Sequence, residues 1–584
     1  MKGKKVDPEL IKLRHKVHMM GDLDTLQTLI ARTYATYGDR LAIVEKNKDQ
    51  LINHTSRELC ESIYAVGTAL NAMGLHGKHI AMLGEGSFNW IVSFFAVACG
   101  VGISVPLDKE LTDYELSKLM TKADCEAVFC SKTYFKTAKL HMQNDERVKN
   151  VFTLNGKCDD EGFMSIDELI KKGKELIANG DRSYIDAKIE KDDVAAIVFT
   201  SGTTGANKGV MLTHYNFSSN VDGIIDTITQ EATSFSVLPM NHVYELSCNI
   251  MTSIYMNAVI YINDSLRNIL PNIQLFKPDA FNSVPLILEG IYNGIWAAAA
   301  QRGKAEPLKK LVKLSNKLLA HGIDLRNVLF ASIRKNFGNT FPTLVCGGAP
   351  SRLEHVTGLY AFGFNVYQGY GLTESSPTVT LNLHAGTSPE SAGFAFPKAK
   401  FKIVDPDENG VGEIWITGAN LFKGYYKDEE ATKASFEGEW FKTGDYGRTN
   451  DKHELFVVGR KKNLIILDNG KNVFPEEVES AVMEGIRYVH EVVAFEAVKN
   501  IKGKDHKMIA VGVYVDPKDF PEKSHEEIEK QVLDDMTNVN RNMSAYKRIQ
   551  DVMVSFEEFP KTSTRKVVRQ KVIDAYNEKN QVKI

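Results

Sequence analysis

Residues 199–209 read Phe-Thr-Ser-Gly-Thr-Thr-Gly-Ala-Asn-Lys-Gly, directly after an apolar, strand-like run at 195–199. Glycines let backbone N–H groups approach an anion closely, hydroxyl groups donate further hydrogen bonds, and the lysine adds a positive charge. These are the requirements of a loop that binds a triphosphate. The alternative is a polar hairpin that binds no ligand. We disfavour it because such a hairpin has little need for so many hydroxyl groups.

This stretch is not a Walker P-loop. That motif places Gly immediately before its Lys, Ser or Thr after it, and a helix next. Here Asn207 precedes Lys208, and the apolar run 209–212 predicts a second strand instead of a helix. The sequence therefore disfavours a kinase or a motor ATPase.

Outward from this stretch, strand-length apolar runs alternate with longer helical patterns between about residues 42 and 381, for example at 79–83 and 127–129. Such alternation is typical of βαβ units and predicts an α/β fold. From residue 401 the pattern changes to short strands joined by turns, which predicts a β-rich subdomain. A tail with its own strands and a helix from about residue 525 predicts a small α+β domain. We expect a large N-terminal domain over 1–461 and a small mobile C-terminal domain over 462–584.

Length, charge and cysteine content narrow the class of protein. A chain of 584 residues is too long for one hydrophobic core. Its 71 Lys and Arg nearly balance its 74 Asp and Glu, which argues against a nucleic-acid partner. The seven cysteines are scattered and form no CxxC pair, so the sequence predicts neither a disulfide framework nor a zinc site.

The N-terminus lacks the apolar core of a signal peptide, so we expect a cytoplasmic enzyme. The apolar stretch 90–107 is nearly long enough to span a membrane. Gly100, Gly102 and Pro106 interrupt it, however, and we predict a buried helix over 88–99 followed by a short strand at 103–105.

Five further segments carry polar or glycine-rich motifs in a fixed order. Gly347-Gly348-Ala349-Pro350 and residues 368–375 (Gln-Gly-Tyr-Gly-Leu-Thr-Glu-Ser) each follow a predicted strand. Residues 440–445, 459–462 and 560–566 lie downstream. Together with 199–209, this series resembles the adenylate-forming (AMP-binding) superfamily, which includes acyl-CoA synthetases, nonribosomal peptide adenylation domains and firefly luciferase. The resemblance runs from about residue 22 to residue 569.

The resemblance implies a role for each matching residue. Glu374 would hold Mg²⁺, for which a carboxylate is a suitable ligand, Thr373 would bind the α-phosphate of ATP, and Asp445 would bind the ribose with Arg460 nearby. Lys566 would bridge the substrate carboxylate and the α-phosphate, and it matches the family lysine better than Lys561 does. The 347–350 segment and the ring of Tyr370 would bracket adenine. The residues implied in nucleotide binding are Thr200, Ser201, Gly202, Thr203, Thr204, Gly205, Lys208, Gly347, Gly348, Ala349, Pro350, Gly369, Tyr370 and Gly371.

Lys462 stands where the family has its hinge, so the resemblance implies that the tail domain rotates between two half-reactions. Two positions depart from the family pattern. Asn207 replaces a usual Pro and leaves Lys208 in place. Arg565 replaces a usual Gly, which would add about 1 kcal/mol of strain if the loop needs a positive φ there.

The acid is indicated by segments at 84–90, 238–245, 283–289 and 470–477, which look most like those of bacterial long-chain fatty acyl-CoA synthetases. His242 would lie near the substrate carboxylate, and Tyr244 could act as a gate. The resemblance implies ATP, Mg²⁺ and coenzyme A as co-substrates or cofactors, a medium- or long-chain fatty acid as substrate, and peripheral contact with a membrane to collect it. An enzyme for an aryl or bile-type acid, a ligase for acyl carrier protein, and an inactive nucleotide-binding scaffold are the alternatives. The oligomeric state is not predicted.

Overall fold

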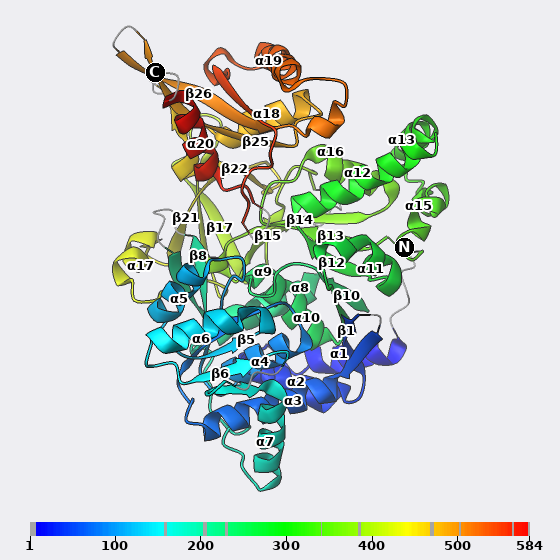
Figure 1. Cartoon of the computed structure of the whole chain (residues 1–584). Coiled ribbons are helices and arrows are strands. Elements are labelled where there is room, and N and C mark those ends of the chain that lie inside the picture. Colours follow the sequence, from blue (N-terminus) through cyan, green and yellow to red (C-terminus); the bar gives the residue numbers. More distant parts are fainter. Residues whose placement is uncertain are drawn as a thin grey trace. The chain divides into compact units, whose positions relative to one another are not determined.

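The computed structural model describes residues 7–48, 50–156, 160–201, 207–227, 232–339, 341–382, 387–467, 472–501, 504–562 and 566–581. The chain forms two compact units (Figure 1). Unit 1 comprises Met1–Phe401 and Ile416–Phe441, and unit 2 comprises Lys402–Trp415 and Lys442–Ile584. These units do not coincide with a division at 461/462, because residues before 462 group with the tail; that domain boundary stays a prediction.

The first sheet of unit 1 has the strand order β16-β15-β14-β13-β12-β10-β11-β1-β2. The strands from β14 to β1 in this order run parallel, and β2, β15 and β16 are antiparallel to their neighbours. The strands are β1 (Leu41–Asn47), β2 (Gln50–Thr55), β10 (Thr233–Ser236), β11 (Val259–Ile262), β12 (Ala280–Ser283), β13 (Thr343–Cys346), β14 (Asn365–Gly371), β15 (Thr378–Asn382) and β16 (Phe394–Ala395).

The second sheet of unit 1 has the order β19-β9-β8-β4-β3-β5-β6-β7. Its strands from β8 to β7 in this order are parallel, whereas β9 is antiparallel to both β8 and β19. The strands are β3 (His79–Leu83), β4 (Ile103–Pro106), β5 (Cys125–Cys130), β6 (Asn150–Thr153), β7 (Phe163–Ser165), β8 (Val194–Ser201), β9 (Asn207–Thr213) and β19 (Gly424–Tyr425).

Helices connect and cover these strands, and local capping explains where several begin. Thr112 with Glu115, and Ser165 with Glu168, form capping boxes, which satisfy the free N–H groups at a helix start. The helices of unit 1 are α1 (Pro8–His18), α2 (Leu26–Tyr37), α3 (Ser56–Ala72), α4 (Phe88–Ala98), α5 (Asp113–Lys122), α6 (Phe135–Asn144), α7 (Ile166–Ala178), α8 (His214–Thr227), α9 (Val243–Glu245), α10 (Thr252–Met256), α11 (Ile269–Phe276), α12 (Pro285–Gln301), α13 (Ala305–Ala320), α14 (Arg326–Leu329), α15 (Ala331–Lys335), α16 (Leu353–Phe362) and α17 (Glu429–Ser435). A π-helical turn at Leu246–Met251 separates α9 from α10.

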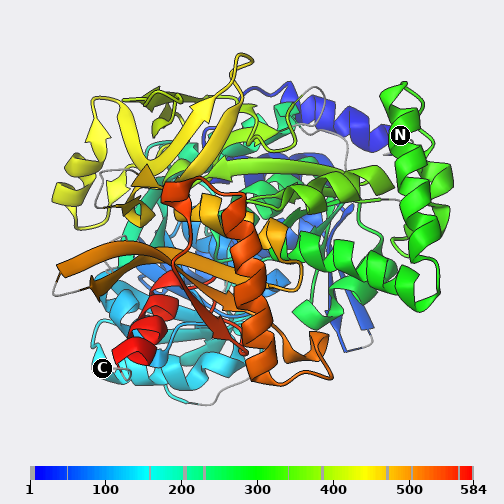
Figure 2. The same ribbon diagram turned by 90° about the horizontal axis from the view of Figure 1, so that it is seen from above.

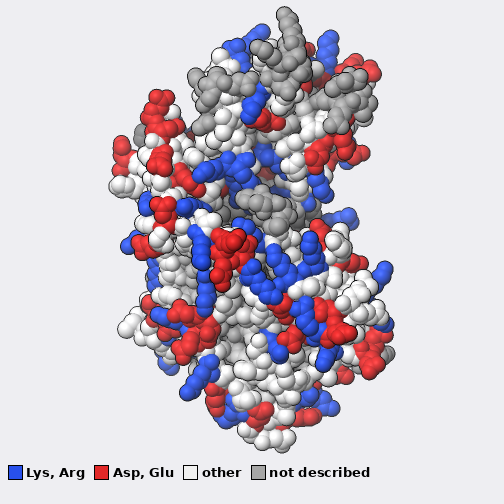
Figure 3. All heavy atoms as spheres, turned by 90° about the vertical axis from the view of Figure 1, so that its left-hand side faces the viewer, with Lys and Arg blue, Asp and Glu red and all other residues white. Residues whose placement is uncertain are grey.

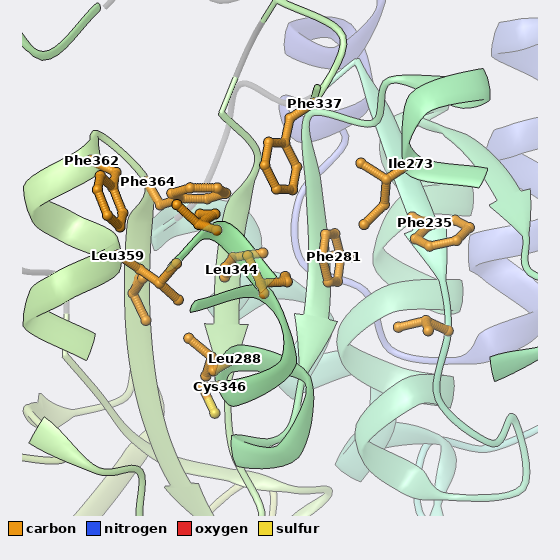
Figure 4. Packing of buried hydrophobic residues seen from close by; sticks show 14 of the residues in the cluster. Phe235, Ile273, Phe281, Leu288, Phe337, Leu344, Cys346, Leu359, Phe362 and Phe364 are labelled. Carbon is orange, nitrogen blue, oxygen red and sulfur yellow. The ribbon is translucent and has the colours of Figure 1, made fainter. Parts of the chain in front are cut away.

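An apolar cluster of the first sheet lies between its strands and the helices α11, α12 and α16 (Figure 4). Phe281 of β12 and Leu344 of β13 face Leu288 of α12 and Leu359 of α16, and all four are at most 2% exposed. Fully burying such side chains contributes about 1.5–3 kcal/mol each. This packing fixes the carboxyl ends of β12 and β13, where two of the predicted motifs begin.

The apolar stretch at 90–107 forms the buried helix α4 and the strand β4, as predicted. All residues of α4 except Asn89 are buried, and the helix packs against β3 and β4. Within the described part of the chain, no helix has the length and apolar character needed to cross a membrane.

Beyond residue 398 the chain forms the predicted β-rich segment, with the strand order β17-β18-β21-β20 and β22 beside β21. Three of these strands pass from one unit to the other. The strands are β17 (Ala399–Val404), β18 (Gly412–Gly418), β20 (Phe436–Glu437), β21 (Trp440–Thr449) and β22 (Leu455–Arg460).

The tail in unit 2 is an α+β fold around a three-stranded sheet (Figure 2). Alternate strand residues face opposite sides: Ala494 and Val511 join a cluster with α18 and α19, whereas Phe495 and Ala510 join one with α20. This period of two is what a sheet covered on both faces requires. The elements are β23 (Ile465–Ile466), β24 (Asn472–Val473), α18 (Pro475–Gly485), β25 (Glu491–Ile501), β26 (Lys504–Tyr514), α19 (His525–Arg541), β27 (Asp551–Ser555) and α20 (Arg569–Gln581).

The predicted α/β fold class, with a large N-terminal part and a smaller α+β tail, is confirmed.

Candidate active site

Four of the predicted segments of unit 1 follow parallel strands of the first sheet. β10 pairs with both β11 and β12, so the chain leaves β10 in one direction and returns on its other side. Such a point in an open α/β sheet is where ligands bind, outside the strand ends. The segment with His242 follows β10, Val284 follows β12, Gly347 follows β13, and Thr373 follows β14.

The glycine- and hydroxyl-rich stretch forms a hairpin of β8 and β9. Thr200 lies opposite Lys208 and Ser201 lies opposite Asn207. The carbonyl of Asn207 accepts a hydrogen bond from Lys122 Nζ at 2.6 Å. Asn207, which replaces the usual Pro of the family, is therefore held in place in the sheet. Gly202, Thr203, Thr204 and Gly205, together with Ala206, lie outside the described residues.

Tyr425 links the predicted phosphate-binding lysine to the predicted magnesium ligand. Its hydroxyl donates a hydrogen bond to Glu374 Oε1 at 3.0 Å, and Lys208 Nζ lies 4.4 Å from the centre of its ring. The ring is buried, and its strand pairs with β9. A cation over a tyrosine face and a hydrogen bond to a carboxylate are both favourable. Lys208 and Glu374 therefore both contact the side chain of Tyr425.

The backbone adds a second connection to the same place. Phe422 N–H donates to the carbonyl of Glu374 at 2.9 Å, and Tyr426 N–H donates to the carbonyl of Gly209 at 2.7 Å. Glu374 lies in a 3-10 turn, Thr373–Ser375, which follows directly on β14. Residues 422–426 therefore hold the Glu374 turn against the strand that carries Lys208.

The predicted adenine-binding segments are neighbours at the ends of β13 and β14. Cys346 pairs with Gln368, so the Gly347–Pro350 segment starts beside Gly369 and Tyr370. Gly371 cannot be replaced without movement, because a Cβ there would lie 1.8 Å from the carbonyl oxygen of Pro377. Sequence reasoning placed Tyr370 in a loop after a strand, whereas the structure extends β14 to Gly371, where it pairs with β15.

The predicted acyl segment is anchored to the predicted adenine-binding segment by Tyr244. This side chain is half-buried, and its hydroxyl donates to the carbonyl of Val345 at 2.6 Å. A Cβ on Gly347 would lie 3.3 Å from the Tyr244 ring, so glycine allows their close approach. Asn282 Nδ2 donates to the carbonyl of Tyr244 at 3.1 Å. Tyr244 is thus held between the ends of β12 and β13.

His242 caps the short helix α9. Its Nδ1 accepts a hydrogen bond from Tyr244 N–H at 3.2 Å, so the neutral ring carries its proton on Nε2. Glu245, in the same helix, is fully buried. Burial raises its pKa to about 8, although hydrogen bonds with Ser236 and Asn249 oppose that shift. At pH 7 this carboxyl group is mainly neutral, so it adds no full charge to the acyl segment.

In unit 2, Asp445 and Arg460 face each other across the β21–β22 hairpin. They are paired residues, and Arg460 Nε lies 3.2 Å from Asp445 Oδ1. Asp445 is 4% exposed, whereas nearly half of the Arg460 side chain is exposed. The backbone N–H of Asp445 donates to Thr443 Oγ1 at 3.0 Å, which fixes the turn before it. This pair offers a carboxylate held in place beside an accessible guanidinium group.

Lys566 lies within electrostatic reach of that pair. Its pKa is lowered to about 8, mainly by desolvation and next by the positive charge of Arg460, whereas Asp445 raises it. The residue as a whole is exposed. Arg565 lies outside the described residues, and its effect on the loop stays a prediction.

Lys561 is already committed to other partners. Its ammonium pairs with Glu491 and lies 2.7 Å from Glu558 Oε2, and these contacts raise its pKa against the effect of burial. Among the residues that the structure describes, no ion pair involves Lys566. This difference favours Lys566 over Lys561 as the lysine that is available to a substrate.

Lys462 lies in a 3-10 turn, Lys461–Asn463, that joins β22 to the tail. Desolvation, together with Arg460 and Arg569, lowers its pKa, and Asp445 opposes this. Lys461 beside it is anchored to Glu413 at 3.1 Å. The predicted hinge is therefore a short turn between anchored segments.

A family model described as AMP-binding enzyme matches residues 30–426, and a second, described as AMP-binding enzyme C-terminal domain, matches residues 462–581. The first match alone covers more than half of the chain. The chain belongs to the AMP-binding enzyme family.

Three relatives indicate where this AMP-binding enzyme lies within the family. Fatty acyl-CoA synthetase B of Dictyostelium discoideum is 30% identical over 519 residues, which is 81% of this chain and 75% of the relative. A chloroplastic long-chain-fatty-acid–[acyl-carrier-protein] ligase of Arabidopsis thaliana is 26% identical and covers 93% of this chain and 84% of its own length. A long-chain-fatty-acid–CoA ligase of Mycobacterium tuberculosis is 26% identical over 80% of this chain and 78% of its own.

Solved structures of other adenylating enzymes have the same fold. The adenylation domain of a carboxylate reductase from Mycobacterium chelonae matches with a TM-score of 0.79 and 20% identity, over 99% of this chain and 94% of that chain. ATP-bound MatB from Rhodopseudomonas palustris matches with a TM-score of 0.73 and 22% identity, over 94% and 99%. At such identities these matches establish the fold of this AMP-binding enzyme.

Sequence reasoning missed Tyr425 in this AMP-binding enzyme. It lies 51 positions after Glu374 and 217 after Lys208, and no local spacing connects the three. Only the pairing of β19 with β9 brings the tyrosine to the other two. A tyrosine directly after a glycine in a two-residue strand carries no sequence signal for this role.

Proposed function

We propose that the enzyme activates a medium- or long-chain fatty acid with ATP, releases pyrophosphate, and transfers the acyl group from acyl-AMP to coenzyme A. The observation that carries this proposal is that Lys208 and Glu374 both contact Tyr425. The predicted adenine-binding segments lie at the ends of the neighbouring strands β13 and β14. An ATP site needs a cation for the phosphates, a carboxylate for the metal ion and a flat surface on which the base can lie.

Glu374 fits a magnesium site of the kind that ATP itself completes. No group of three or more His, Cys, Asp and Glu in the described ranges could hold a metal ion, so the chain offers no all-protein cage there. Mg²⁺ normally uses one or two carboxylates together with phosphate oxygens and water. Bound there, it would neutralise negative charge on the phosphates. Tyr425 fixes one oxygen of Glu374.

The first half-reaction joins two anions. A carboxylate oxygen of the fatty acid attacks the α-phosphorus of ATP, the bond to the bridging oxygen breaks, and pyrophosphate leaves. Lys566 would neutralise charge on the carboxylate and the α-phosphate, and Thr373 would donate to that phosphate. Asp445 would accept from the ribose hydroxyls, with Arg460 holding the aspartate.

The second half-reaction replaces AMP with a thiol. The thiol sulfur attacks the acyl carbonyl, the thiol proton is lost, and AMP leaves with the electrons of the broken acyl–oxygen bond. We propose that movement at Lys462 withdraws Lys566 before this step, so that one acyl site serves both reactions.

Two alternatives remain within the same chemistry. The Arabidopsis relative is named as a ligase for acyl carrier protein, so the thiol of a carrier protein is the second candidate acceptor. Aryl or bile-type acids are the other candidate substrates. We place the enzyme in the cytoplasm as a proposal; named relatives include chloroplastic and peroxisomal proteins.

A panel of acids from acetate to palmitate tests the choice of substrate. Each buried methylene contributes about 0.8 kcal/mol, or roughly a fourfold gain in kcat/KM. We expect kcat/KM for pyrophosphate release to climb with chain length and then level off. Each acid is assayed with coenzyme A and with carrier protein. A flat profile, or a preference for acetate or benzoate, would contradict the fatty-acid assignment but not adenylation itself.

Val284→Trp tests the wall of the acyl site in the same assay. Val284 precedes α12, is 8% exposed and follows β12, whose Asn282 contacts Tyr244. A larger side chain there should shift the optimum toward shorter acids. Leu286→Trp is the matched control, because Leu286 lies two residues further on, in α12, and is 44% exposed. An equal shift in both variants would mean that Val284 does not line the site.

Tyr425→Phe should weaken adenylation while the ring stays in place. The variant loses one hydrogen bond to a charged acceptor, which is worth about 1.5–3 kcal/mol. We therefore expect a fall of about ten- to a hundredfold in kcat/KM for ATP, together with a higher Mg²⁺ requirement. Magnesium titrations of pyrophosphate release measure both.

Tyr426→Phe provides the matched control for that experiment. The Tyr426 hydroxyl donates to Asp124 Oδ2 at 2.6 Å, so this variant also loses a hydrogen bond to a carboxylate. Asp124 is paired with Arg147 at 2.7 Å and with Lys427. If both variants change the Mg²⁺ requirement equally, Tyr425 has no special role in holding Glu374.

A further inference from the structure

Residues 302–335, which we term the basic helical segment, carry a charge unlike that of the rest of the chain. The segment contains nine Lys and Arg but only two Asp and Glu, a net charge of +7 in a chain whose net charge is −3. It comprises α13, α14 and α15 in unit 1, which lie at the edge of that unit in both views (Figures 1 and 2). By contrast, Lys and Arg alternate with Asp and Glu across the face shown in Figure 3.

Both acidic residues of the basic helical segment are already paired. Glu306 lies 2.9 Å from Lys309 Nζ, and Asp324 pairs with Arg326 at 2.8 Å. Six other cations are exposed, and across the described ranges no ion pair involves any of them. They are Arg302, Lys304, Lys310, Lys313, Lys317 and Lys335. Their charge is therefore not neutralised within the described structure.

The two faces of α13 have different uses. Leu308, Leu311 and Val312 pack against the apolar core cluster of the first sheet. On the opposite face, Lys310, Leu314 and Lys317 follow the i, i+4, i+7 spacing that places side chains in one row. Leu314 is 48% exposed among these lysines. The lysine face is thus not needed for the fold.

Exposed aliphatic side chains accompany the cations. Beyond α13, Ile323 is 48% exposed, Leu325 is 41% exposed and Val328 is 73% exposed. Each is a side chain that folded proteins usually bury, and the four with Leu314 lie within fifteen residues. Unpaired lysines interleaved with exposed aliphatic groups are the pattern of a segment that lies on an anionic lipid surface.

We propose that the basic helical segment docks the enzyme on a bilayer that contains anionic phospholipid. The lysines would meet the headgroups, and the aliphatic side chains would enter the boundary with the acyl chains. Charge complementarity supports lipid as the occupant, because six uncompensated cations need a surface with many negative charges. The proposed function supplies the purpose, since a long-chain acid partitions into bilayers, but docking and acyl-AMP formation can each fail without the other.

Vesicle co-sedimentation of the full-length enzyme tests this proposal. The wild type should bind vesicles of phosphatidylcholine with 30% phosphatidylglycerol and should bind pure phosphatidylcholine far more weakly. Each cation near an anionic surface contributes roughly a fivefold gain in partitioning. The triple variant Lys310→Gln, Lys313→Gln, Lys317→Gln should therefore lose on the order of a hundredfold. Glutamine keeps the helix propensity close to that of lysine.

A matched triple variant on α7 controls for net charge. Lys171, Lys172 and Lys174 lie in one helix of the same unit, together with three acidic residues. Their change to Gln removes the same charge and should leave partitioning unaltered. If this variant loses binding as strongly as the α13 variant, or if the α13 variant binds like the wild type, the proposal is wrong.

Val328→Trp reports on the apolar contact independently. The emission of the added tryptophan should shift to shorter wavelength when the enzyme binds the anionic vesicles, because the side chain leaves water. Leu51→Trp, at a site on β2 that is 47% exposed, should show no shift. Equal shifts at the two sites would overturn the assignment. The proposal would also be wrong if the enzyme does not bind vesicles but binds an acidic carrier protein, and if the α13 triple variant loses that binding.

Discussion

Lys566→Ala is expected to abolish acyl-adenylate formation and to leave the thioesterification of supplied acyl-adenylate largely intact. Only the first half-reaction brings a carboxylate and a phosphate together, so only that step needs the cation. Loss of one preorganised group of this kind typically costs about 10² to 10³ in rate. Pyrophosphate release and coenzyme A consumption, each measured separately, distinguish the two steps.

Lys561→Ala is the matched control, because this lysine is tied to Glu491 and Glu558. We expect it to alter the stability of the tail and to leave the rate of adenylation nearly unchanged. If Lys566→Ala forms acyl-AMP at the wild-type rate and Lys561→Ala does not, the assignment of the two lysines must be exchanged.

The pH dependence of adenylation tests the role of Lys566 in a second way. Desolvation and Arg460 lower the pKa of Lys566 to about 8 in the free enzyme. The positively charged form is the one that binds the two anions, so kcat/KM for adenylation should fall as pH rises through about 8. Lys566→Arg should move this fall to higher pH, because arginine keeps its charge there. A fall at an unchanged pH would assign it to another group.

Lys462→Pro is expected to uncouple the half-reactions. Proline fixes φ near −65° and restricts the residue before it, so a turn that must change its dihedral angles would be locked. We expect near-normal adenylation and a collapse of the thioester rate. Rapid-quench measurement of acyl-AMP should show the intermediate accumulating on the enzyme.

Lys462→Ala separates the backbone from the side chain. It removes the ammonium group and leaves the turn free to move, so both half-reactions should continue. Equal losses in the two steps of the proline variant would mean that Lys462 is not the hinge. A thioester defect in the alanine variant that matches the proline variant would assign the effect to the lysine charge.

The sequence alone determined the features that depend on neighbouring residues. Alternating apolar runs gave the α/β class, and interrupted hydrophobicity at Gly100 and Gly102 identified α4 as a buried helix. The order of the short motifs indicated the family, because each motif is a short run of characteristic residue types. These signals are local, so a linear chain displays them directly.

Tertiary structure alone decided which of those residues meet. Pairing of β19 with β9 brings Tyr425 to Lys208 and Glu374 across 217 and 51 positions. The pairing of β21 with β22 joins Asp445 to Arg460. Of the two lysines in the 560–566 motif, Lys561 has ion pairs, whereas none involves Lys566 among the described residues. Likewise, the lysines of α13 became significant once its other face was seen in the core. Such contacts depend on strand register and on which charges are already neutralised, and neither is set by the spacing of residues along the chain.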